Sequence, residues 1–111
     1  MEGARIVCAE LDAAFAASIT DSQFFPVGVF EQPVRISLVQ NFTDQTIIFS
    51  YDGITNNFVL PPNGFLVVDI GTNKGSVNTA AIPSGQGIFA KALIGLVPTT
   101  GFIYSSYWYT E

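Results

Sequence analysis

The chain has 111 residues, a formal net charge of −5, 49% hydrophobic residues and only 12% charged residues. This length suits one domain with a single core, and the charged fraction is about half of the ~25% usual in soluble proteins. The four basic residues are scattered and form no patch that could neutralise a phosphate backbone, which excludes direct nucleic-acid binding. They are Arg5, Arg35, Lys74 and Lys91.

We expect no secretory signal peptide at the N-terminus and no transmembrane helix in the sequence. Glu2, Arg5, Glu10 and Asp12 interrupt the first twelve positions, so the basic start and apolar run of a secretory signal peptide are lacking, and we expect synthesis in the cytoplasm. The longest charge-free run, residues 92–110, is broken by two glycines and a proline, which excludes a transmembrane helix. We therefore expect no membrane partner.

The first third of the chain predicts one strand followed by an arm. CAELDAAFAASI alternates in a way that favours a strand, although its alanines also permit a helix. Cys8 is the only cysteine, so it forms no intrachain disulfide, and we expect it to be a small buried hydrophobic residue. Residues 18–33 hold two prolines and show no sustained period, which indicates an irregular connection or an extended arm.

From residue 33 onward the sequence predicts strands and turns. Segments of four to ten residues, rich in β-branched and aromatic residues, alternate with Gly, Pro, Asn and Asp. Residues expected to share a face are Val34, Ile36 and Leu38 in one strand, and Ile47, Phe49 and Tyr51 in another. We predict an all-β chain: one small antiparallel β-sandwich of jelly-roll or immunoglobulin-like type, with residues 1–32 as an N-terminal strand and extended arm and residues 33–111 as the sandwich core of a single domain.

Several of these strands are apolar on both faces. In GFLVVDI, Phe65 and Val67 share a face with Asp69, yet Leu66 and Val68 on the opposite face are also apolar. In the last strand the set Phe102, Tyr104 and Trp108 opposes the set Ile103, Tyr107 and Tyr109. A two-layer sandwich buries only one face of each strand, so the second apolar face predicts contact with neighbouring subunits.

The polar clusters predict turns rather than chemistry. Asp52-Gly53 and the PPNG segment at 61–64 carry residues that suit tight turns. The chain contains no histidine, which excludes Ser-His and Cys-His nucleophile systems, and Asp52 lacks the companion carboxylates of a calcium loop. Asp69, the one acid deep in an apolar run, is expected to be a strand-end residue. We predict no catalytic residue, no metal site and no cofactor.

Residues 33–109 resemble the small β-sandwich virion proteins encoded among the structural genes of tailed bacteriophages, on the stretches PVRISLVQNFTDQTIIFSYDGITNNFVLPPNGFLVVDIGTNKG and GIFAKALIGLVPTTGFIYSSYWY. The resemblance implies a non-enzymatic subunit that forms a ring or trimer and contacts other virion proteins at the head–tail junction, in the tail or on the capsid. It implies no catalytic residue.

We therefore expect a homo-oligomeric virion structural protein at the head–tail connector or tail region. Alternatives are a capsid decoration (cement) protein or a carbohydrate-binding domain on the virion surface, the latter because exposed aromatic rings can stack on sugars. The residues predicted to form the interface are Phe24, Phe25, Val27, Val29, Phe30, Tyr107, Trp108 and Tyr109.

Overall fold

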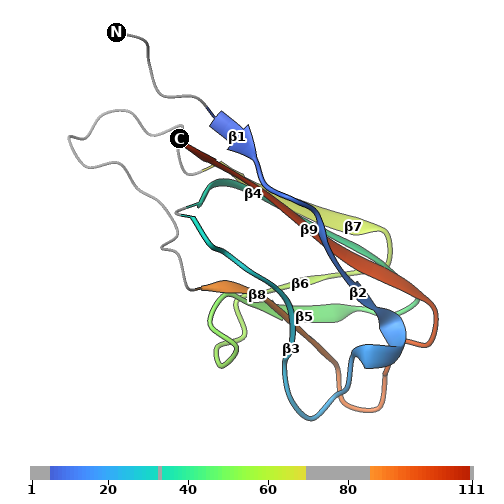
Figure 1. The fold of residues 1–111 in the computed structure, drawn as a ribbon. Coiled ribbons are helices and arrows are strands. Elements are labelled where there is room, and N and C mark those ends of the chain that lie inside the picture. Colours follow the sequence, from blue (N-terminus) through green and yellow to red (C-terminus); the bar gives the residue numbers. More distant parts are fainter. Residues whose placement is uncertain (1–5, 33, 70–85, 111) are drawn as a thin grey trace, which may run out of the picture.

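Two antiparallel sheets pack face to face in the computed structural model, which describes residues 6–32, 34–69 and 86–110 (Figure 1). Strand β9 lies at the centre of the first sheet, sheet A, whose order is β1-β9-β4-β7, with β2 also paired to β9. The second sheet, sheet B, has the order β3-β8-β5-β6. The prediction of a small all-β sandwich is confirmed.

The described residues form nine strands and one short 3₁₀ helix. Their bounds are β1 Ile6–Cys8, β2 Asp12–Phe15, η1 Ala16–Ser18, β3 Phe25–Val29, β4 Val34–Thr43, β5 Ile47–Ser50, β6 Phe58–Leu60, β7 Gly64–Asp69, β8 Gly87–Ala92 and β9 Gly101–Thr110. Residues 70–85, which the sequence placed in the sandwich core, lie outside the described residues. Within the described segments no helix is long and apolar enough to cross a membrane.

The N-terminal third belongs to the sandwich, which corrects the expectation of an arm over residues 18–33 and of a boundary at residue 32. One strand was predicted near the N-terminus, but β1 and β2 both pair with β9, and β3 pairs with β8. Strand β3 lies at the edge of sheet B, where Pro26 is tolerated because an edge strand needs hydrogen bonds on one side only. A register shift between Pro26 and Gly28 disrupts its alternation, which hid the strand from sequence reading.

The core lies between the two sheets and spans both predicted parts of the domain. Ile19 and Phe30 from the N-terminal third pack in the same buried cluster as Ile47, Phe49 and Ile103. Ile47 and Phe49 are fully buried and Tyr51 packs against them, which confirms that these three residues share a face. Burying branched and aromatic side chains of this kind contributes about 1.5–3 kcal/mol each.

A bulge at the start of strand β4 reverses which side chains point into the core. Val34 is fully buried, whereas Ile36 and Leu38 lie on the outer face, so the expectation that these three residues share a face is wrong for Val34. The register with β9 shifts between Val34 and Ile36, and one extra residue reverses the alternation.

Cys8 also differs from expectation, because it is exposed. Strand β1 pairs with β9 alone, and Cys8 stands opposite Trp108 on the outer side of the sheet, where the second sheet does not cover it. Its thiol donates to the Ala9 carbonyl oxygen at 3.4 Å.

Candidate functional site

The outer face of sheet A is a candidate contact surface, formed by side chains that alternate along the strands with those that fill the core. The strand register places these residues in four rows across the sheet. The rows are Phe15–Phe102–Phe42, Ala13–Tyr104–Gln40–Phe65, Ser106–Leu38–Val67 and Cys8–Trp108–Ile36–Asp69. We call this set the outer face.

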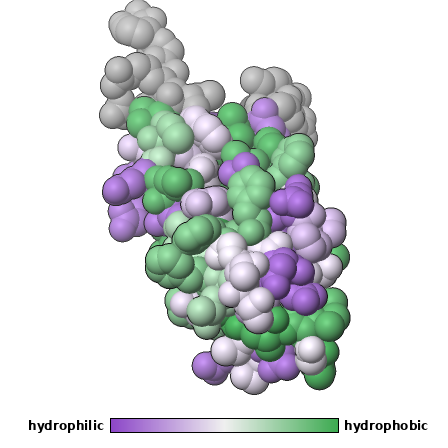
Figure 2. Space-filling model, turned by 90° about the vertical axis from the view of Figure 1, so that its right-hand side faces the viewer, coloured by the Kyte–Doolittle hydropathy of each residue, from purple (hydrophilic) through white to green (hydrophobic). Residues whose placement is uncertain are grey.

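Large apolar side chains on the outer face are exposed. Phe15 and Phe65 keep 64% and 66% of their surface accessible, and Phe42, Val67 and Phe102 are also exposed. Figure 2 shows apolar side chains gathered across the middle and the lower part of the side that it presents. Because a sandwich needs only one buried face per strand, this second apolar face is not required for the core.

Aromatic rings on the outer face pack against one another. The ring centroids of Phe15 and Phe102 are 5.1 Å apart, and those of Phe42 and Tyr104 are 5.8 Å apart in an edge-on arrangement. Phe102 and Tyr104 stack at 5.8 Å along β9. These contacts hold four rings from three strands in a single cluster, so the surface is shaped before any partner arrives.

The outer face is nearly free of charge. Of the residues in its four rows, Asp69 is the only one of the Asp, Glu, Lys and Arg types, and it lies at a corner, at the end of β7. The net charge of −5 is therefore carried almost entirely by other parts of the chain.

The structure separates the residues that the sequence predicted as an interface. Val27, Phe30 and Tyr107 are buried in the chain's own core, where the rings of Phe30 and Tyr107 meet edge-on at 5.0 Å. The hydroxyl oxygen of Tyr107 accepts a hydrogen bond from the Glu31 N–H at 3.2 Å. These three side chains therefore lie in the core of the chain and not on its surface.

The remaining predicted residues lie at different places on the molecule. Phe25 and Tyr109 are partly buried against the core, and Phe24 lies beneath the ammonium group of Lys91, 4.6 Å from its ring centroid. Val29 is exposed beside a pocket, and Trp108 lies half-buried in the outer face. Of the eight predicted residues, Trp108 alone belongs to the outer face.

Sequence reasoning did not place Phe15, Phe42, Phe65 and Phe102 among the candidate contact residues, although all four are exposed. The signal was present in the apolar residues on both faces of the later strands, which put Phe65 with Val67 and Phe102 with Tyr104. This signal predicted contact with neighbouring subunits but did not single out these four residues. Alternation cannot say which of two apolar faces meets the second sheet.

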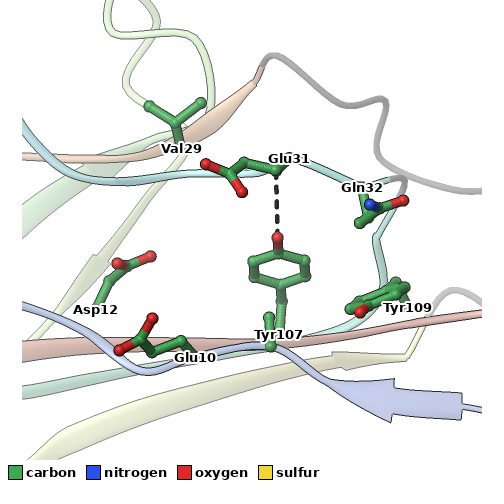
Figure 3. Close-up of a pocket in the computed structure, with 8 residues that line it drawn as sticks. Glu10, Asp12, Val29, Glu31, Gln32, Tyr107 and Tyr109 are labelled. Atoms are coloured by element: carbon green, nitrogen blue, oxygen red, sulfur yellow. Dashed lines mark hydrogen bonds between the residues drawn. The ribbon is translucent and has the colours of Figure 1, made fainter.

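A pocket of about 250 Å³ opens between the N-terminal segment and the loop after β3 (Figure 3). It is lined by Ala9, Glu10, Asp12, Val29, Glu31, Gln32, Tyr107 and Tyr109. The carboxyl groups of Glu10, Asp12 and Glu31 face the same hollow. Burial raises the pKa of Asp12, and the charges of Glu10 and Glu31 raise it further.

The functional groups of this pocket are acids, phenols and an amide. Its lining offers carboxyl groups, phenols and one amide, but no thiol, amine or imidazole. Throughout the described part of the chain, no three His, Cys, Asp or Glu side chains are placed to hold a metal ion.

The polar clusters predicted as turns do form turns. The carboxylate of Asp52 accepts hydrogen bonds from the N–H groups of Ile54 and Thr55 at 2.9 and 2.8 Å, and these bonds lower its pKa. Gly53 and Asn63 both have positive φ, and the Gly64 N–H closes the PPNG turn on the Pro61 carbonyl oxygen at 2.9 Å. The carboxylate of Asp52 is thus hydrogen-bonded to the backbone of its own turn.

No protein-family model matches the sequence, and its comparison with curated proteins and with solved structures also gives no match. The outer face is therefore the feature from which function is argued.

Proposed function

We propose that this protein is a non-enzymatic structural subunit of a bacteriophage virion, acting at the head–tail connector or tail region and associating with its own copies. The observation that carries this proposal is the outer face of sheet A, which exposes phenylalanine rings and has one charged residue, Asp69, at its corner. Exposed apolar surfaces of this extent are typical of sites where proteins meet.

The chemistry of the described residues agrees with a role in assembly. The carboxylate of Asp52 accepts hydrogen bonds from backbone N–H groups of its own turn, and the pocket described above offers carboxyl groups, phenols and an amide but no thiol, amine or imidazole. The charged fraction of 12% is low for a solitary domain that must keep its whole surface hydrated. A subunit held permanently among neighbours has less surface to hydrate.

The test is the composition of purified particles. A phage that carries this gene is grown and banded on a density gradient, and the particles are analysed by quantitative mass spectrometry and by electron microscopy with an antibody against the chain. We expect a fixed copy number per particle and label at the connector or tail. Label over the capsid surface would instead favour the decoration protein, and absence from intact particles while the chain is abundant in the lysate would reject a virion role.

Carbohydrate binding on the virion surface is the second candidate, favoured by the exposed rings of Phe15, Phe42 and Phe102. Together with Tyr104, these rings meet at angles of 24° to 65° and do not form one flat platform. A glycan array probed with the purified chain tests this role. Binding that is lost in a Phe102→Ala variant would support it.

A further inference from the structure

We infer that the outer face of sheet A binds the outer face of a second copy of this chain, in a two-fold contact whose axis runs parallel to the strands between β9 and β4. This inference rests on the proposed self-association and names the surface and the geometry that produce it. Four properties of the face carry it: charge, area, relief and chemical composition.

The charge distribution favours a second copy. Two chains that each carry a net charge of −5 repel one another unless the surface where they meet is free of like charges. The acids fall outside the rows of the outer face except for Asp69, which occupies a corner. Two copies can therefore approach through this face with their acidic groups held at the periphery.

The area is sufficient for a specific contact. Four strands about 4.8 Å apart and four rows about 6.7 Å apart give a flat area of roughly 500 Å² per copy. Two such faces give about 1,000 Å², and the protruding rings raise the accessible area toward the range of ~1,200–2,000 Å² found in stable specific complexes. A closed pair covers the whole face on both copies, whereas a ring would need a second, different surface.

The relief of the face is self-complementary about the inferred axis. Rotation about a line between β9 and β4 keeps each row in place and exchanges β2 with β7 and β9 with β4. The small Ala13 on β2 of one copy then faces the bulky Phe65 on β7 of the other, because both lie in the same row. In the central rows Ser106 faces Leu38, and Tyr104 faces Gln40, so small and large side chains meet and the one amide meets a hydroxyl.

The composition of the face disfavours other occupants. A bilayer surface attracts basic residues, and none lies in the four rows. A glycan needs many hydrogen-bonding partners, yet the uncharged polar side chains of the rows are confined to Tyr104, Gln40, Ser106, Cys8 and the Trp108 N–H. Aromatic and branched aliphatic side chains dominate, as they do in interfaces between permanent partners.

The experiment measures the mass of the full chain by light scattering and by sedimentation equilibrium from about 0.1 to 100 μM. We expect the wild type to be a dimer. Phe65→Glu places a charge in the contact and should raise the dissociation constant by about a hundredfold. Val59→Glu is the matched control: Val59 is similarly exposed, at 55%, but lies on the outer side of sheet B, and its substitution should change the constant by less than about threefold.

A mixing experiment tests the axis itself. Ala13→Lys should also weaken self-association, because it sets an ammonium group against Phe65 of the partner copy. An equimolar mixture of the Phe65→Glu chain and the Ala13→Lys chain should form mixed dimers, since one contact becomes an ion pair and the other keeps the native residues. Circular dichroism and melting temperature confirm that each variant is folded.

Several results would overturn the inference. These are a wild type that stays monomeric up to 100 μM, a Phe65→Glu variant that dimerises as well as the Val59→Glu control, a mixture that stays monomeric, and a monomer that binds glycans through Phe65. The outcome is separable from the proposed function. A dimer that is absent from purified particles rejects only the virion role, and a monomer incorporated into particles rejects only this contact.

Discussion

Replacement of Asn41 by alanine tests how the turns are held at the end of the sandwich beside the aromatic cluster. Asn41 is fully buried on β4, and its side-chain amide nitrogen donates to the carbonyl oxygens of Gln45, Leu60 and Pro61 at 3.0, 2.9 and 3.2 Å. Its side-chain oxygen accepts from the N–H and the hydroxyl of Thr43 at 3.0 and 2.7 Å. One side chain thus joins the β4–β5 turn to the β6–β7 turn, which connects the two sheets.

The magnitude follows from these contacts. The amide has two hydrogens for three carbonyl groups, so the five contacts amount to about four hydrogen bonds, each worth roughly 1 kcal/mol net. Alanine also leaves buried donors and acceptors without partners. We expect Asn41→Ala to lower the free energy of unfolding by about 3–4 kcal/mol, against a total of about 5–15 kcal/mol for a typical domain. The melting temperature should fall by about 15 °C.

Urea unfolding followed by circular dichroism measures this loss, and two further variants locate its cause. Thr43→Val removes the hydroxyl that donates to Asn41 and should cost about 1–2 kcal/mol. Asn41→Asp keeps the shape but turns acceptors toward three carbonyl groups, so it should be at least as destabilising at pH 7 and recover partly at acidic pH, where the protonated carboxyl donates. A loss below about 1 kcal/mol for Asn41→Ala would refute the reasoning.

Three other predictions concern loops and the acidic pocket. Hydrogen bonds to the carboxylate of Asp52 lower the pKa of this group in the folded state. The charged carboxylate therefore stabilises the fold at pH values above its unfolded pKa, and this stabilisation is lost as the pH falls through the folded pKa. Asp52→Asn should flatten the acid-unfolding curve below about pH 4. Burial beside other acids raises the pKa of Asp12 in the folded state, so the fold loses stability as the pH rises through that pKa. Asp12→Asn should therefore raise the melting temperature at pH 7, and this gain should disappear at acidic pH. Gly101 has a φ of +97°, and a Cβ there would collide with the Phe42 carbonyl oxygen, so Gly101→Ala should cost at least about 2 kcal/mol by thermal melting. Gly95 has a φ of +80° with open space around it, so Gly95→Ala should cost about 1 kcal/mol, and equal losses at the two glycines would contradict the steric argument.

Turn chemistry and strand alternation are local, and the sequence predicted both. Gly53 and Asn63 occupy the positive-φ positions of the predicted turns, because few other residue types adopt that conformation without strain. Phe102 and Tyr104 share one face of β9 and Ile103 and Tyr107 share the other, because successive side chains of a strand point in opposite directions. The same alternation indicated that the chain has more apolar surface than one core requires.

Only the tertiary structure decided which apolar face became the core. Strand β3 finds its partner β8 about sixty residues away, and this pairing draws Val27 and Phe30 inward, where the sequence had placed an arm. The packing of sheet B against one side of sheet A buried Tyr107 and left Phe102 exposed, although both lie on the same strand. Alternation defines two faces for each strand, but the choice between them depends on contacts between segments far apart in the chain, and a single bulge reverses it.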